Sequence, residues 1–372
     1  MFSWELKVFL EYRLKGLKGS PDQAGSYEND FINALFQSDR RIKENLKKLR
    51  SVFPKLESLT LRSWKLGYMH FRIIAQLNLK ELKLDCCRSL IRSKWLSYAL
   101  NGLQGSLENL SVSDISMWGS FSQIITSLAT CSNLTVLDFN IGDVKYRRKL
   151  DNFEVDIEKL QYGCPKLKDL TLVGTRDYVL SLTKISPDQE AASPGFPNLE
   201  RLVVLQSCED FEVGFDDTNI NDDLIRRILK TSSKLRELKL CNCSVSYEGF
   251  SQIAANDVAL LNILTCDTPD VNDLKQILTK WVHSLEKVDL CIVADISDAL
   301  EVLAMMKSAS RLKYIKLTDT YISQQTMRNI LSNCPLLEYF DLSILTKGDD
   351  FLFTSATEIE QFRLELNAPL KC

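Results

Sequence analysis

The residue types that most often carry out catalysis are scarce in this sequence. His70 and His283 are the only histidines among 372 residues, and neither has a neighbour at the spacing of metal ligands or of a catalytic triad. The motifs GxGxxG, GxxxxGKS/T, GxSxG and HExxH do not occur. We therefore predict that both histidines are structural or surface residues, and we expect no catalytic residue, no cofactor site and no metal site.

Eleven cysteines are the other candidates for chemistry. Cys86 and Cys87 are adjacent, and Cys241 and Cys243 are separated by one residue, so neither pair has the C-x-x-C spacing of zinc sites. Charged residues such as Glu5 interrupt the apolar N-terminus, which therefore does not resemble a secretory signal peptide. We expect a cytoplasmic and/or nuclear protein in which the cysteines are reduced and serve packing.

Charge and hydropathy narrow the classes of partner. The 46 basic and 49 acidic residues give a formal net charge of −3, which argues against a broad nucleic-acid surface. No apolar run approaches the roughly 18 residues that a membrane span requires. We expect neither nucleic acid nor a membrane as a partner.

The pattern apolar-x-x-apolar-x-apolar recurs along the chain and reveals an internal repeat. Its twelve copies start at Leu56, Leu79, Leu107, Leu134, Leu167, Leu199, Leu235, Val258, Leu285, Leu312, Leu337 and Ile359. Most intervals between starts fall within the roughly 20–29 residues of leucine-rich repeats. In each copy the last two apolar residues alternate, so both point from a short strand into the core.

Helices are predicted between the strands, because apolar residues recur there at helical spacing. The stripes are Phe121, Ile124, Ile125 and Leu128; Leu224, Ile228 and Leu229; and Met327, Ile330 and Leu331. Asn221 and Ser323 are candidate helix N-caps. The sequence therefore predicts an α/β fold: a curved leucine-rich-repeat solenoid of about twelve repeats, with parallel strands on the concave face and helices on the convex face.

Cysteines recur at two places in the repeat, where a small buried side chain fits. Cys87, Cys243 and Cys266 follow a hexamer by three residues, whereas Cys131, Cys164 and Cys334 precede one by three residues at the end of a helix. Such cysteines are typical of the cysteine-containing class of leucine-rich repeat.

Two regions are expected. Residues 1–50 contain no hexamer and include a basic amphipathic stretch that we predict to be a capping helix, while residues 51–372 form the solenoid. Three long intervals are expected to emerge as loops, and residues 208–223 hold seven acidic residues and no basic one. A recognition loop and a solvated variable loop are both open interpretations of this stretch.

The outward residues of the strands should line the concave face and form a mixed-charge surface for a protein partner. The candidate binding residues are Lys83, Asp138, Lys239, Asp289, Tyr314, Lys316, Tyr339, Asp341 and Arg363. Tyr314 and Tyr339 stand at equivalent positions of consecutive repeats, so we predict that they are adjacent. Tyrosine is enriched at interface hot spots, although ordinary solvated strand faces would look the same in sequence.

With the repeats in register, the chain resembles the F-box/leucine-rich-repeat proteins from about residue 40 to its C-terminus. The segments that carry the resemblance are FPKLESLTLRSWK from Phe53, IEKLQYGCPKLKDLTL from Ile157, SPGFPNLERLVV from Ser193, LIRRILKTSSKLRELKLCNCSVSYEGF from Leu224, LTKWVHSLEKVDL from Leu278 and ISQQTMRNILSNCPLLEYFDL from Ile322.

The resemblance implies a non-catalytic substrate receptor of a Skp–cullin–F-box ubiquitin ligase, in which the repeats hold the target for ubiquitination and proteasomal degradation. The family's F-box is not found ahead of the repeats, so the Skp adaptor and the cullin are expected as partners only if an F-box is supplied. The alternatives are a repeat-only scaffold or inhibitor that binds a protein without ubiquitin transfer, and a GTPase-activating repeat protein. The irregular repeat intervals disfavour the last of these.

Overall fold

The computed structural model describes most of the region that carries the repeats. The described residues are 56–62, 66–87, 91–113, 117–118, 121–140, 153–174, 180–182, 195–206, 222–241, 246–264, 270–291, 296–305, 311–318, 320, 322–343, 351–353, 357, 359–361 and 364. The predicted capping helix in residues 1–50 lies outside them.

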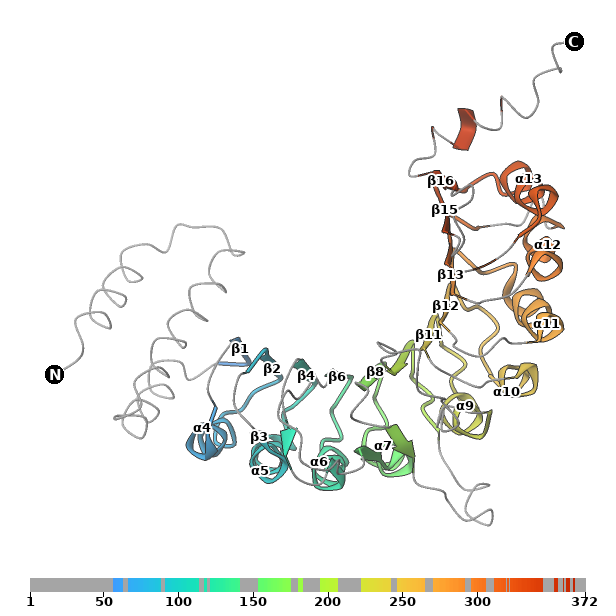
Figure 1. Cartoon of the computed structure of the whole chain (residues 1–372). Helices are drawn as coiled ribbons and strands as arrows, with labels where there is room; N and C mark the ends of the chain where they lie inside the picture. The colour runs from blue at the N-terminus through green and yellow to red at the C-terminus, as the bar shows by residue number, and fades with distance from the viewer. Residues whose placement is uncertain are drawn as a thin grey trace, which may run out of the picture.

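Each of eleven repeats contributes one strand to a single sheet (Figure 1). The parallel strands, in their order across the sheet, are β1 (Ser58–Arg62), β2 (Glu81–Asp85), β4 (Asn109–Ser113), β6 (Val136–Asn140), β8 (Asp169–Gly174), β10 (Arg201–Gln206), β11 (Glu237–Cys241), β12 (Leu260–Leu264), β13 (Lys287–Cys291), β14 (Tyr314–Thr318) and β15 (Tyr339–Ser343). The register pairs equivalent residues of consecutive repeats, as in Leu82 with Leu110.

Helices lie along the outer side of the curve and strands along the inner side, and the line of strands turns between β8 and β11 (Figure 1). The helices are α4 (Tyr68–Ile74), α5 (Ser93–Leu103), α6 (Phe121–Leu128), α7 (Ile157–Gly163), α9 (Asp222–Leu229), α10 (Tyr247–Ser251), α11 (Val271–Trp281), α12 (Ser297–Met305) and α13 (Gln324–Asn333). The predicted architecture, with parallel strands on the concave face and helices on the convex face, is confirmed.

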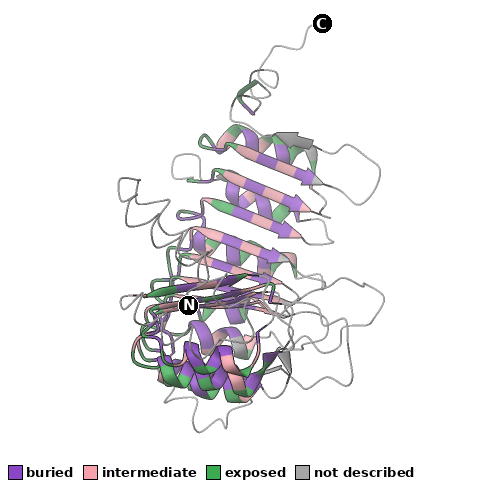
Figure 2. Cartoon of the chain, turned by 90° about the vertical axis from the view of Figure 1, so that its left-hand side faces the viewer, coloured by how far each residue is buried: buried purple, intermediate pink, exposed green. Residues whose placement is uncertain are grey.

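The core lies between the sheet and the helices, and the hexamer pattern places it there. In β2, Leu82 and Leu84 are buried, whereas the alternating residues Glu81, Lys83 and Asp85 are not. Figure 2 shows this alternation along the strands. Burying such a leucine contributes about 1.5–3 kcal/mol, so the repeated pairs supply much of the stability of the solenoid.

The helices follow the predicted stripes. Phe121, Ile124, Ile125 and Leu128 are the buried face of α6, and Met327, Ile330 and Leu331 are buried in α13. Ile228 and Leu229 are buried in α9, while the side chain of Leu224 and the candidate cap Asn221 lie outside the described part. Ser323 caps α13 as predicted, because its Oγ accepts a hydrogen bond from the Thr326 backbone N–H at 3.0 Å.

Buried cysteines join consecutive repeats. The Sγ of Cys164 donates to the carbonyl of Leu128 at 3.3 Å, and that of Cys334 to the carbonyl of Leu303 at 3.6 Å. Cys87 donates to Leu61 at 3.5 Å. The seven cysteines that the structure describes form no disulfide, while Cys243 and Cys266 lie outside these residues.

The twelfth predicted repeat is wrong. Ile359, Glu360 and Gln361 are helical, and Leu364, which a strand would bury, is 60% exposed. The last strand of the sheet is instead β16 (Phe351–Phe353), which pairs antiparallel with β15 and takes the edge that a further parallel strand would need. Arg363 lies outside the described residues, so it cannot be placed on the binding surface.

Short strands also occur outside the main sheet. β3 (Ile91–Arg92) pairs with β5 (Met117–Trp118), and β7 (Phe153–Val155) pairs with β9 (Leu180–Leu182). The second pair links two of the long inter-repeat segments. Of the acidic stretch 208–223, only Asp222 and Asp223 are described, and they open α9.

Candidate protein-binding surface

The first, third and fifth residues of each parallel strand lie on the concave face, because the second and fourth point into the core, although the third residues of β8 and β10, Thr171 and Val203, are also buried. The strand register aligns the third residues in one row across the sheet. This middle row consists of Thr60, Lys83, Ser111, Asp138, Thr171, Val203, Lys239, Asn262, Asp289, Lys316 and Asp341. The structure therefore places eight of the nine predicted binding residues on one continuous surface, six of them in this row.

Tyr314 and Tyr339 meet at the C-terminal end of this surface, as predicted. Their rings are stacked, with centroids 4.4 Å apart and ring planes 4° apart. The Tyr339 hydroxyl donates to Asp341 Oδ2 at 3.2 Å. Burial raises the pKa of Tyr314 to about 12, and the neighbouring Tyr339 and Asp289 act in the same direction. Both phenols are therefore neutral at physiological pH and present hydroxyl groups beside aromatic surface.

Beside the two tyrosines, the middle row carries charged residues of alternating sign, namely Asp341, Lys316 and Asp289. Asp289 accepts a hydrogen bond from Asn262 Nδ2 at 2.8 Å. Its burial raises its pKa, while the positive charges of Lys316 and Lys239 oppose that rise. A half-buried carboxylate between two lysines can pair with a polar or basic group of a partner more strongly than a fully solvated one, because less water screens it.

A second charged cluster, which the sequence did not single out as a unit, lies where the line of strands turns. Arg201 on β10 donates to Asp169 on β8 at 2.9 and 3.1 Å and to Glu237 on β11 at 3.2 Å. It also donates to the Thr171 hydroxyl at 3.0 Å. One guanidinium thus ties three consecutive strands, a geometry that lysine could not reproduce.

Asp138 and Lys83 occupy the N-terminal half. Asp138 accepts a hydrogen bond from the Ser111 hydroxyl at 2.9 Å, and its burial raises its pKa. Lys83 pairs with Glu81 at 2.6 Å, and this contact holds the pKa of Glu81 below its ordinary value. Both predicted residues are thus already held by hydrogen bonds within the surface.

The histidines have structural positions. His70 is buried, and its Nδ1 accepts a hydrogen bond from the Gly67 backbone N–H at 2.9 Å at the start of α4. His283 is half-exposed, with Nε2 3.8 Å from Asp257 Oδ1. Among the residues that the structure describes, no group of three or more His, Cys, Asp or Glu side chains could hold a metal ion.

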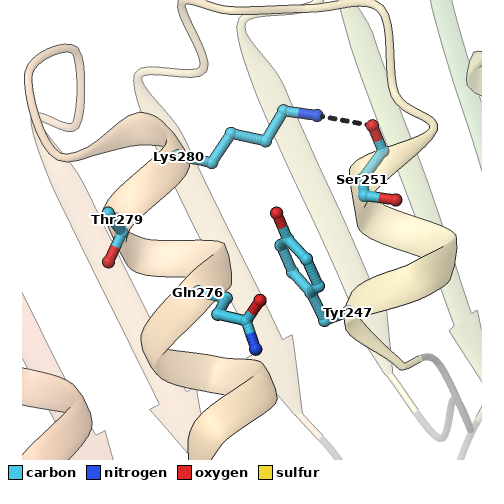
Figure 3. A pocket seen from close by; sticks show the side chains of 5 residues that line it. All are labelled: Tyr247, Ser251, Gln276, Thr279 and Lys280. Carbon is cyan, nitrogen blue, oxygen red and sulfur yellow. Dashed lines mark hydrogen bonds between the residues drawn. The ribbon is translucent and has the colours of Figure 1, made fainter.

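The helix side of the solenoid also has a depression. It lies between α10 and α11 and is lined by Tyr247, Ser251, Gln276, Thr279 and Lys280 (Figure 3). The Lys280 ammonium donates to the backbone carbonyls of Phe250, Ser251 and Ile253 at 3.0, 3.2 and 2.9 Å. All three of its donors are used to end α10, so Lys280 is a capping residue.

Comparisons with known proteins bear on the fold. No family model matches the chain, and no curated protein matches it. Among solved structures, the chain is similar to a chain in the crystal structure of the Rad7 and Elc1 complex of yeast. The TM-score is 0.51 and the sequence identity 17%, over 98% of this chain and 91% of that chain. The likeness at this identity concerns the fold alone.

The architecture defines the class: the chain is a leucine-rich-repeat-like solenoid. In the part of the chain that the structure describes, no helix has the length and apolar character needed to span a membrane.

Proposed function

We propose that this chain is a protein-binding module whose concave face holds a target protein. The observation that carries the proposal is the stacked Tyr314–Tyr339 pair beside Asp289, Lys316 and Asp341. Tyrosine supplies rigid contact area with few rotatable bonds, and alternating charges around such an anchor favour one partner over others.

We further propose that the module is the substrate-recognition part of a Skp–cullin–F-box ubiquitin ligase. The support is the ordered sequence resemblance to F-box/leucine-rich-repeat proteins, within which the segments are most similar to the type 6 member. The similar solved chain comes from a structure of two proteins in complex, which fits a solenoid that acts within an assembly. The Skp adaptor and the cullin would join this chain through an F-box.

In this role the solenoid needs no catalytic residue. Its contribution is to hold the target near the enzyme that transfers ubiquitin, which raises the effective concentration of the target's lysines to the millimolar range typical of tethered partners. The protein would work in the cytoplasm and/or the nucleus.

The proposal is tested by expressing the full chain with an affinity tag in cells and identifying the proteins that co-purify. A stoichiometric Skp adaptor and cullin, together with a further protein, support the ligase role. A further protein without adaptor or cullin supports a repeat-only scaffold or inhibitor instead.

Matched variants locate the contact. Tyr314→Ala with Tyr339→Ala should release the target but keep any adaptor, since the adaptor does not use the concave face in this account. Tyr162→Ala removes a 61%-exposed tyrosine from α7 on the helix side and should change nothing. Retention of every protein by the double variant would contradict a role for the tyrosine pair.

A further inference from the structure

Aromatic and arginine side chains cluster on the helix side of the first two repeats, away from the concave face. Helix α4 contributes Tyr68 and Arg72, which are four residues apart and share one helix face. Helix α5 contributes Trp95 and Tyr98, and Arg92 is its N-cap residue. We call these five residues the aromatic–arginine patch.

The rings of the aromatic–arginine patch hold one another in place. The Tyr68 ring centroid lies 6.4 Å from that of Trp95 and 6.2 Å from that of Tyr98, the latter edge to face at 60°. The Arg72 guanidinium lies 5.8 Å from the Tyr68 centroid and that of Arg92 5.5 Å from the Trp95 centroid. Such contacts favour one arrangement of the five side chains before any partner arrives.

The patch is open to solvent. Tyr68 is 43% exposed and Tyr98 45%, which makes them two of the most exposed large hydrophobic residues of the described chain. Arg72 and Arg92 are also exposed. Tyrosine, tryptophan and arginine are the three residue types most enriched at interface hot spots, and this patch contains all three.

The described charged residues of the elements that carry the patch have a single sign. Strand β3 and helices α4 and α5 carry Arg72, Arg92 and Lys94 and no acidic residue. Within the described residues, the structure pairs neither arginine of the patch with a carboxylate. In contrast, the first turns of α9, α11 and α12 contain acidic residues.

We propose that the aromatic–arginine patch is a second protein-binding surface, which takes an acidic segment of a partner protein. The positive charge selects glutamate and aspartate side chains, and the exposed rings cover the apolar residues between them. The surface lies on the helix side of the array, so it can be occupied while the concave face holds another protein.

An acidic peptide fits the patch better than a nucleic acid strand. Aromatic rings with arginines can stack on bases, but a bound strand follows a longer basic groove along its phosphates. The described residues of β3, α4 and α5 include three cations, Arg72, Arg92 and Lys94, which is few for such a groove, and the chain has a net charge of −3.

The test is fluorescence anisotropy with the full chain. The probe is a labelled synthetic peptide of glutamates around one central phenylalanine, and the comparison probes are the same peptide with lysines for glutamates and a labelled oligouridine. We expect the acidic peptide alone to bind, and its affinity to fall as salt is raised, because salt screens exposed charges. Equal binding of the basic peptide, or tighter binding of oligouridine, would overturn the proposal.

Charge-reversal variants show where the acidic peptide binds. Arg72→Glu with Arg92→Glu should weaken binding about tenfold or more, as expected for the loss of hot-spot arginines. Arg311→Glu with Arg328→Glu is the matched control, because both are exposed arginines far along the array and the change in net charge is equal. Equal losses in the two variants would contradict a localised site.

Two further variants keep the test interpretable. Tyr98→Ala removes an exposed ring, so it should weaken peptide binding even if the double reversal fails to fold, which circular dichroism will reveal. Tyr314→Ala with Tyr339→Ala should leave peptide binding unchanged. The proposal for the concave face and the proposal for the aromatic–arginine patch can therefore be contradicted independently of one another.

Discussion

The ring of Tyr314 lies flat against the ring of Tyr339, with centroids 4.4 Å apart, although 25 residues separate them in sequence. The strand register makes the two residues direct neighbours on β14 and β15. The Tyr339 hydroxyl is further tied to Asp341. The pair is thus a preformed aromatic platform, and little conformational entropy remains to be lost when a partner covers it.

The environment of Tyr314 predicts how it titrates. Its pKa is raised to about 12 from an ordinary value of 10.0, so folding favours the protonated phenol. This stabilisation is complete below pH 10, where both folded and unfolded forms are protonated, and is lost as pH rises towards 12. The ultraviolet difference titration of wild type against Tyr314→Phe should therefore show one phenol that ionises near pH 12. Ionisation of that phenol at pH 10 would contradict the stacked arrangement.

The buried cysteine at the end of α7 predicts which replacements the solenoid tolerates. Cys164 is fully buried and donates to the carbonyl of Leu128. Ser232 stands at the equivalent place three residues before its hexamer, and its hydroxyl donates to the carbonyl of Phe196 at 3.0 Å. Cys164→Ala should therefore cost about 1–2 kcal/mol of unfolding free energy, since it loses both packing and the hydrogen bond.

Cys164→Ser is the matched control and should cost less than the alanine variant. Urea unfolding followed by circular dichroism measures both free energies. A serine variant less stable than the alanine variant would show that this carbonyl is not used by the side chain.

The close approach of α6 and α7 predicts a strict requirement for glycine. A Cβ atom on Gly163, the last residue of α7, would overlap the backbone of Ala129. Gly163→Ala should therefore destabilise the fold by about 1–3 kcal/mol, as other overpacked sites do. Gly105→Ala is the control, because nothing lies within 4 Å of its added Cβ, and thermal unfolding compares the two. Similar melting temperatures for both variants would contradict this packing.

The repeat pattern predicted the parts of the fold that depend on periodicity. The middle-row positions of Lys83 and Asp138 follow directly from the hexamer, because alternation fixes which side of a strand a residue faces. The adjacency of Tyr314 and Tyr339 follows from the same period. Each such prediction needs only the spacing of apolar residues and the rule that equivalent strands stack.

The errors occur where local spacing is ambiguous or where side chains must meet. The spacing of Ile359, Phe362 and Leu364 fits a short strand or a helical turn equally well, and the residues described there, among them Ile359 and Leu364, are helical. Strand β16 pairs antiparallel with β15. The repeat pattern could not predict this pairing, because it describes parallel strands only. The link from Arg201 to Asp169 depends on a side-chain rotamer, so spacing alone could not reveal it.

Site-specific photocrosslinking tests the central claim, that the concave face holds a protein partner, most directly. A photoreactive phenylalanine derivative is placed at Tyr339 on the concave face or at Tyr162 on the helix side, and the full chain is irradiated in cells. The account predicts a discrete crosslinked protein from position 339 that is absent from position 162. Crosslinks from position 162 with none from position 339 would contradict it.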